Sequence, residues 1–397
     1  MNTNPFALRP NRRRRLPERG AAHWFSFVGA GAGYGYGYGY GYQLLGMVVL
    51  SSLMAMLLQW LSSRLGVVTG RDLAQVCRER SGRRRTIFLW LTSKVAIIAC
   101  DVAEVVGSAV ALQLLLGVSL TVGVLMSAVC TFALLALRQK GGRKLEAVIA
   151  SLIGFVGLCF VIELALARPD WHAALAGTAP SGALLRNAGM LWLAAGIVGA
   201  TVMPHNLYLH SSLVKHHAPD HSDAQIRAAL HVVNIDTIGS LLFAFVINAA
   251  LLIVAAAVFY SSGHRDVTDL AAALLACGLS ATVTGTLAGQ AVMEGFLQLR
   301  LPRWKRALLT RALAIGPALV TVTMFGQEGS SQLLVASQVV LSLQLPLAVV
   351  PLIRYASDAR LMRGWRVRGV ALVLVWLSAG FIILLNGALL WQVAFGS

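Results

Sequence analysis

Charged side chains are scarce in this sequence. Only 12% of the 397 residues are Asp, Glu, Lys or Arg, whereas soluble domains average about 25%. Hydrophobic residues make up 57% of the chain, which leaves too few polar residues to coat the surface of soluble domains. The same numbers exclude an intrinsically disordered chain. The composition therefore predicts an all-α polytopic membrane protein.

Acidic residues are rarer than basic ones. The 33 Lys and Arg residues outnumber the 16 Asp and Glu residues and give a formal net charge of +17. In a soluble chain this excess would indicate nucleic-acid binding, but here the basic residues form short clusters between apolar runs. That pattern is typical of cytoplasmic loops, so we expect the lipid bilayer, and no nucleic acid, as a partner.

Cysteine is also sparse, and it forms no C-x-x-C pair. The five cysteines are Cys77, Cys100, Cys130, Cys159 and Cys277. We interpret them as small buried hydrophobic residues rather than as disulfides or zinc ligands. The sequence also contains no nucleotide-binding or nucleophile motif. It therefore predicts neither an enzyme nor an ATP-driven pump, and no cofactor.

Long apolar runs divide the chain into membrane-crossing segments. A helix needs about 20 predominantly apolar residues to cross a bilayer. The runs that meet this condition are 43–61, 86–110, 115–137, 146–168, 188–212, 237–261, 270–296, 307–327, 331–353 and 369–395. With the Gly-rich stretch 24–42 as an optional eleventh, we expect 10–11 transmembrane helices. They form one domain, 24–397, preceded by a basic tail, 1–23.

The distribution of Lys and Arg predicts the orientation. The positive-inside rule places the basic tail and the basic loops in the cytoplasm; these loops are 64–85, 138–144, 298–306 and 354–368. The loops near 169–183, 262–268 and 328–330 contain fewer basic residues and are expected outside. The start of the chain conflicts with this alternation, because 24–61 has room for barely two spans. Its Gly-Tyr repeat is also a poor helix former.

The apolar run 188–212 contains a helix-breaking residue. Pro204 lacks an N–H and its ring clashes with the preceding turn, so the helix must break or kink near 200–203. A break frees backbone carbonyls at mid-membrane depth, and transporters use such carbonyls to build ion sites. The Met203 thioether beside them would favour Mn, Fe, Co or Cd over Mg and Ca. A packing methionine in a simple proline kink is the alternative.

The segment around this proline resembles a known family. Residues 200–211, ATVMPHNLYLHS, are similar to the sixth-helix signature of the NRAMP divalent-metal transporters. Shorter matches occur at 53–59, 69–74, 101–104 and 337–342, and the resemblance covers most of 43–397. It implies a LeuT-like inverted-repeat fold with helices one and six unwound at the centre. It also implies proton-coupled import of Mn²⁺ or Fe²⁺ by a monomer in the bacterial inner membrane.

The resemblance also implies residue roles. The metal site would comprise Met203 through its sulfur, Ala200 through its carbonyl, and Gln338. The proton pathway would comprise Asp101, Glu104, His205, His210, Arg311 and Lys94. Asn206 and Asn248 would be further polar residues of the pathway. Lys94 stands where the family pattern has an acidic residue, and a cation on that helix face would oppose passing protons or metal.

One family motif is missing. The first helix of the family carries Asp-Pro-Gly-Asn, whose Asp and Asn bind the metal, but this chain has no Asp or Glu between Glu18 and Asp72. Because burying unpaired charge is costly, a dication here would lack compensation, and we expect weak or lost metal affinity. One alternative is therefore a defective or engineered NRAMP variant that inserts without conducting. Another is a LeuT-like carrier of organic solutes.

Overall fold

The computed structural model describes residues 40–139, most of 151–179, 187–218, 222–257, Val292, Gly295, Phe296 and 303–395. The basic tail 1–23, all but the last residues of the Gly-Tyr segment 24–42, and most of the predicted span 270–296 lie outside these residues.

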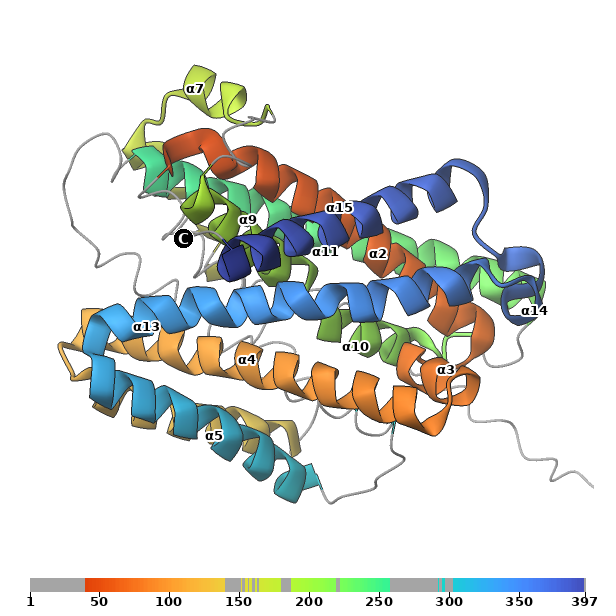
Figure 1. Cartoon of the computed structure of the whole chain (residues 1–397), viewed down its shortest axis with the longest axis horizontal. Helices are drawn as coiled ribbons and strands as arrows, with labels where there is room; N and C mark the ends of the chain where they lie inside the picture. Colours follow the sequence, from red (N-terminus) through yellow and green to blue (C-terminus); the bar gives the residue numbers. More distant parts are fainter. Residues whose placement is uncertain are drawn as a thin grey trace, which may run out of the picture.

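The described part of the chain is helical and contains no strand. Its longer helices are α2 (Leu45–Thr69), α4 (Arg83–Leu116), α5 (Leu120–Gln139), α9 (Ala188–Val202), α10 (Pro204–Val214), α11 (Asp223–Ala255), α13 (Arg303–Ser357) and α15 (Gly369–Phe395). Its shorter elements are η2 (Gly41–Leu44), α3 (Leu73–Arg80), α7 (Trp171–Ala176), α14 (Ala359–Met362) and η4 (Arg363–Trp365). Figure 1 shows the long helices gathered into one bundle.

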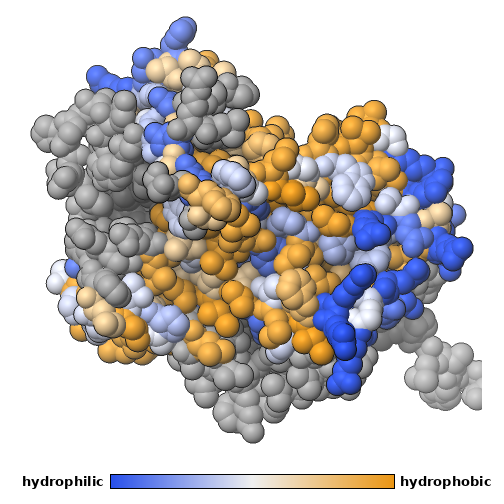
Figure 2. All heavy atoms as spheres, viewed as in Figure 1, coloured by the Kyte–Doolittle hydropathy of each residue, from blue (hydrophilic) through white to orange (hydrophobic). Residues whose placement is uncertain are grey.

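Six segments of the described chain are long and apolar enough to cross a membrane. They are Gly41–Thr69, Arg83–Gln113, Ala188–Val214, Asp223–Ala255, Leu333–Ser357 and Gly369–Gln392, each of which overlaps a predicted span. Large apolar side chains on them are exposed; Leu384 of α15, for example, is 74% exposed. Apolar side chains cover much of the face in Figure 2, and hydrophilic ones gather near the end that carries α14. Such a surface fits a lipid environment.

Helix ends differ from the predicted spans in three places. α2 continues to Thr69 and α11 begins at Asp223, beyond the predicted 43–61 and 237–261. Hydropathy marks only the part of a helix inside the bilayer, whereas the polar turns that continue it are set by caps such as Ser222, which accepts from the Gln225 N–H. The predicted loop at 328–330 is wrong, because α13 is helical throughout. Its ribbon turns back on itself in Figure 1, so the reversal occurs within helical backbone.

The broken pair α9 and α10 lies at the centre of the bundle, in contact with α2 and α13. Two glycines permit this close packing. A Cβ on Gly199 of α9 would overlap the Gln338 carbonyl oxygen of α13, and one on Gly66 of α2 would lie 2.5 Å from the Ser211 carbonyl oxygen of α10. Small residues let membrane helices approach backbone to backbone. The sequence thus places α13 directly against the break.

Candidate functional site

The predicted break is confirmed at Met203. α9 ends at Val202 and α10 begins at Pro204, while Met203 between them has φ 38° and ψ 101°. A positive φ is strained for a residue with a side chain and persists only where its surroundings enforce it. Pro204 suits the first position of a helix, since its missing N–H is not needed there. The local sequence therefore ends one helix and starts the next within a single residue.

The break leaves the Ala200 carbonyl without its usual donor. In a continuous helix this oxygen accepts a hydrogen bond from the N–H of residue 204, but residue 204 is proline. The Asn206 N–H, which in a continuous helix would bond to the Val202 oxygen, bonds to the Met203 oxygen at 3.0 Å instead, so the backbone is rearranged at the break. Ala200 is only 1% exposed. A strong backbone acceptor is therefore held inside the bundle beside Met203.

The sulfur of Met203 lies beside α4 and α13. Met203 is fully buried and forms one small cluster with Cys100 of α4 and Leu341 of α13. The Asn206 side-chain Nδ2 donates to the Met203 Sδ over 3.4 Å. A thioether, a backbone carbonyl and an amide side chain therefore meet at the break.

Several buried polar atoms on the surrounding helices have no hydrogen-bond partner among the described residues. They include Asn206 Oδ1 and His205 Nδ1 on α10, Gln338 Oε1 on α13 and Asn248 Oδ1 on α11. An unsatisfied buried polar atom costs about 1–3 kcal/mol, so native proteins retain few of them. Gln338 and Asn206 were both predicted from the sequence to face the pathway. Their unsatisfied oxygens are available as ligands.

The predicted acidic pair lies on α4. Asp101 and Glu104 are both buried and follow Cys100 closely along the helix. The Cys100 thiol donates to Glu104 Oε1 over 3.5 Å. Lys94 lies two turns earlier on the same helix. The Cys100 contact therefore links the acidic pair to the cluster that contains Met203, a link that sequence reasoning missed.

The remaining predicted residues lie on three helices. His210 of α10 is buried, and its Nε2 is 3.4 Å from Thr237 Oγ1 of α11. Asn248 lies further along α11, and Arg311 lies in the first part of α13. The structure thus brings Met203, Ala200 and Asn206 together, while His210 contacts α11 instead. Thr237 had no signal in the sequence, because a threonine inside an apolar helix is usually bonded to its own backbone.

Paired polar groups tie α10 to its neighbours, two of them at its C-terminal end. Lys215 Nζ lies 2.7 Å from Asp72 Oδ2, in an ion pair whose side chains are 15% and 3% exposed. The Leu73 N–H donates to Ser211 Oγ at 3.0 Å, and Ser62 Oγ of α2 donates to the Leu207 oxygen at 2.6 Å. These bonds hold α10 against α2 and α3.

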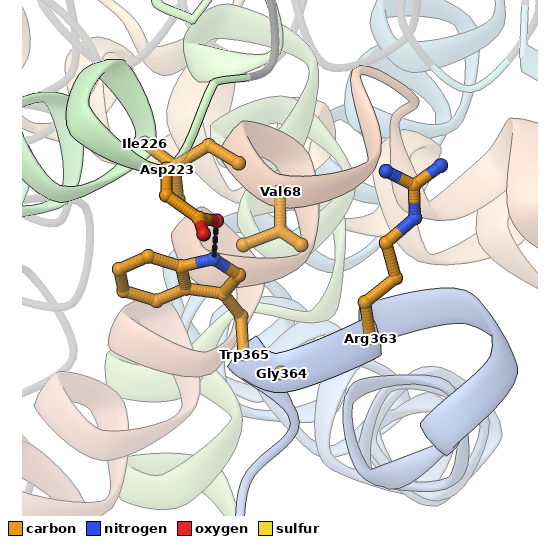
Figure 3. A pocket seen from close by; sticks show the side chains of 6 residues that line it. All are labelled: Val68, Asp223, Ile226, Arg363, Gly364 and Trp365. Atoms are coloured by element: carbon orange, nitrogen blue, oxygen red, sulfur yellow. Dashed lines mark hydrogen bonds between the residues drawn. The ribbon is translucent and has the colours of Figure 1, made fainter.

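A pocket lies elsewhere, where the ends of α2 and α11 meet η4. Trp365 Nε1 donates to Asp223 Oδ1 at 2.9 Å across it, and Arg363 extends along its other side (Figure 3). Arg64 of α2 adds a bond of 2.8 Å from its Nε to the Trp365 oxygen. The lining includes no residue of the helix break. The pocket therefore belongs to the contact between these helix ends.

The helical bundle with its broken central helix fits the predicted LeuT-like fold, and solved structures confirm this fold. The nucleobase-cation-symport-1 family transporter Mhp1 matches with a TM-score of 0.57 at 15% identity, covering 94% of this chain and 90% of that one. MhsT matches with a TM-score of 0.54 at 14% identity, covering 92% of this chain and 96% of that one. At these identities the likeness shows the fold alone.

Closer matches establish the family. The family described as Natural resistance-associated macrophage protein-like (Nramp) matches residues 20–274 and 270–392. The Divalent metal cation transporter MntH of Xanthomonas campestris is 48% identical, over 89% of this chain and 84% of that protein. A mutant of the Eremococcus coleocola manganese transporter has a TM-score of 0.84 at 33% identity, covering 95% of this chain and 87% of that one. The chain belongs to the NRAMP family of membrane transporters, and the prediction that it is no enzyme is confirmed.

Proposed function

We propose that this chain transports divalent metal cations, with Mn²⁺ or Fe²⁺ as substrate, through the break at Met203. The observation that carries this proposal is the meeting of a buried thioether with a carbonyl deprived of its amide donor. The names of the Xanthomonas and Eremococcus relatives support metal as the cargo. A purely structural kink would explain the positive φ of Met203, but not the unsatisfied Oδ1 of Asn206, whose amide contacts the Met203 sulfur.

The donor set matches transition metals. Met203 offers a soft sulfur, and the Ala200 carbonyl and the Gln338 and Asn206 amides offer hard oxygens. Mixed sulfur and oxygen ligands suit Mn²⁺, Fe²⁺ and Cd²⁺, whereas Mg²⁺ and Ca²⁺ prefer oxygen alone. The site would therefore discriminate against the two most abundant divalent cations. This discrimination is the main requirement for a metal importer.

Proton coupling is the second part of the proposal. Asp101 and Glu104 are buried in α4, and His205 and His210 are buried in α10. Ionisable residues inside a membrane are costly and usually belong to a substrate or proton pathway. We propose that these residues, with Arg311 of α13, carry protons alongside the metal. Lys94 would slow this flow by placing a positive charge on the same helix.

The last part of the proposal concerns the orientation of the chain in the membrane and its affinity for metal. We propose that the N-terminus and the α2–α4 connection lie in the cytoplasm, because both carry basic clusters. We also propose that the protein acts as a monomer in the inner membrane of a bacterium. Because 24–42 lacks the family's first-helix Asp and Asn, we propose that the chain binds metal more weakly than its relatives. No carboxylate of the first helix is present to offset the charge of the dication.

Uptake of Mn²⁺ into proteoliposomes tests the proposed function. The native chain is compared with Met203→Ala and with Met190→Ala, which truncates another buried methionine of the same broken span. We expect saturable uptake that Met203→Ala abolishes and Met190→Ala retains. An inward proton gradient should increase the native rate. A folded native protein without Mn²⁺ uptake would instead support the non-transporting variant.

A further inference from the structure

Cys100 occupies an unexpected position in the bundle. It lies on α4, is fully buried, and shares its small cluster with Met203 and Leu341. Its thiol donates to Glu104 Oε1 over 3.5 Å, so Cys100 contacts an acidic side chain and also belongs to the cluster of Met203. Sequence alone suggests only a small hydrophobic residue at this position. The structure instead places Cys100 of α4 in the same buried cluster as Met203.

A second observation at the same place points to a ligand. Asn206 directs its Nδ2 to the Met203 sulfur, and its Oδ1 has no partner among the described residues although Asn206 is only 3% exposed. An unsatisfied buried oxygen on an amide that contacts the Met203 sulfur is unfavourable in a purely structural core. A cation bound to this oxygen would satisfy it.

We propose that Cys100 is a second sulfur ligand at the Met203 site and gives this chain a preference for thiophilic cations such as Cd²⁺. This inference rests on the proposed function, because it places the cargo at Met203. Thiolate and thioether together favour soft cations over Mn²⁺, which prefers oxygen.

Cys100 would also supply negative charge to a site that lacks the first-helix carboxylate. When the cation binds, the Cys100 S–H bond breaks, a sulfur–metal bond forms, and the proton passes to the Glu104 carboxylate that already accepts its hydrogen bond. The negative charge of Glu104 is thereby moved onto a sulfur in contact with the metal. This charge would partly replace the first-helix carboxylate that the sequence lacks.

Cys77 provides the matched control. It is also fully buried, but it lies on α3 in the main core, away from Met203. Burial, reinforced by the negative charge of Asp72, raises the pKa of the Cys77 thiol to about 12. It therefore controls for a buried, protonated thiol that lies outside the cluster of Met203.

The test uses two full-length variants in detergent, each retaining a single cysteine while the other four are changed to Ser. One retains Cys100 and the other retains Cys77. Titration with Cd²⁺ should produce the ultraviolet sulfur-to-cadmium charge-transfer band only in the protein that retains Cys100. Adding Met203→Ala to that protein should lower the Cd²⁺ affinity by at least about tenfold, because even outer-sphere changes at metal sites cost that much.

Single variants in the otherwise native chain control for misfolding caused by the four Cys→Ser substitutions. Cys100→Ser and Cys100→Ala should both remain monodisperse and lose the Cd²⁺ preference over Mn²⁺. Equal bands in the two single-cysteine proteins, or none in a folded protein that retains Cys100, would overturn the proposal. Mn²⁺ uptake that depends on Met203 would then still support the proposed function, so the two failures are distinguishable.

Discussion

The two ends of α10 differ in whether their buried polar groups have hydrogen-bond or ion-pair partners. At its C-terminal end, Ser211 and Lys215 each pair with a group of the segment that begins α3. At its N-terminal end, Asn206 Oδ1 and His205 Nδ1 are buried and have no partner among the described residues. α10 and its C-cap residue therefore combine paired polar groups at one end with unpaired ones at the other.

This difference separates stability from function. Paired polar groups hold α10 in place, whereas unpaired ones cost free energy that folding alone does not require. Departures from complete pairing are expected at functional sites, where a ligand supplies the missing partner. Changes at the paired end should therefore alter stability, and changes at the break should alter binding.

The largest effect is expected at Gly199, where α9 packs closely against α13 beside the break. Gly199→Val would force side-chain carbons into the Gln338 carbonyl oxygen, since even a single Cβ at this position would overlap that oxygen. We expect destabilisation of more than about 3 kcal/mol, and loss of monodisperse protein in size-exclusion chromatography. Gly239→Val is the control, since a Cβ there meets nothing within 4 Å. Normal behaviour of both variants would contradict the close α9–α13 packing.

The ion pair at the paired end should give the next largest effect. Lys215→Met leaves the Asp72 carboxylate buried without its cation, which should destabilise the fold by about 3 kcal/mol. Thermal unfolding in detergent measures the change. Adding Asp72→Asn should recover part of the loss, because the uncompensated charge is removed while an amide can still cap α3. Additive effects of the two substitutions would show that the pair does not interact.

A single hydrogen bond between α2 and α10 should contribute less. Ser62→Ala removes the bond of 2.6 Å from Ser62 Oγ to the Leu207 oxygen, and we expect a loss of about 1 kcal/mol. The neighbouring Ser63→Ala removes only a bond to the Trp60 oxygen of its own helix. The unfolding temperature should therefore fall more for Ser62→Ala than for Ser63→Ala. The opposite order would indicate that the α2–α10 contact adds little.

At the break, a substitution should lower the metal affinity without lowering the stability of the fold. Gln338→Met keeps the side-chain volume but removes the buried Oε1 that has no partner in the described residues. Without metal, we expect the unfolding temperature to stay nearly the same or rise, because Oε1 has no bond to lose and Nε2 loses only its bond of 3.5 Å to Ser337 Oγ. Mn²⁺ affinity, measured by calorimetry, should fall. A destabilised protein with unchanged affinity would assign Gln338 to packing instead.

The sequence alone predicts the break better than it predicts the surroundings of the break. Pro204 determines locally where a helix must end, because the missing N–H acts on the preceding turn. The apolar runs likewise predict the six spans found in the described residues. By contrast, the Asp72–Lys215 pair joins residues 143 positions apart, and neither sequence neighbourhood contains a signal for the other.

Cys100 shows the same limit within the site. Its spacing from Glu104 indicates that the two share a helix face, but only the packing of α4 against the break places it in the cluster with Met203. The role of 24–42 also depends on tertiary contacts, and most of that segment lies outside the described residues.

Anomalous diffraction from crystals of the native chain grown with Mn²⁺ tests the central claim most directly, with Met203→Ala crystals as the matched control. We expect one strong peak within bonding distance of the Met203 sulfur and the Ala200 carbonyl oxygen, absent from the variant. A well-ordered break with no peak at saturating Mn²⁺, or a peak that survives Met203→Ala, would contradict the claim that the break is the metal site.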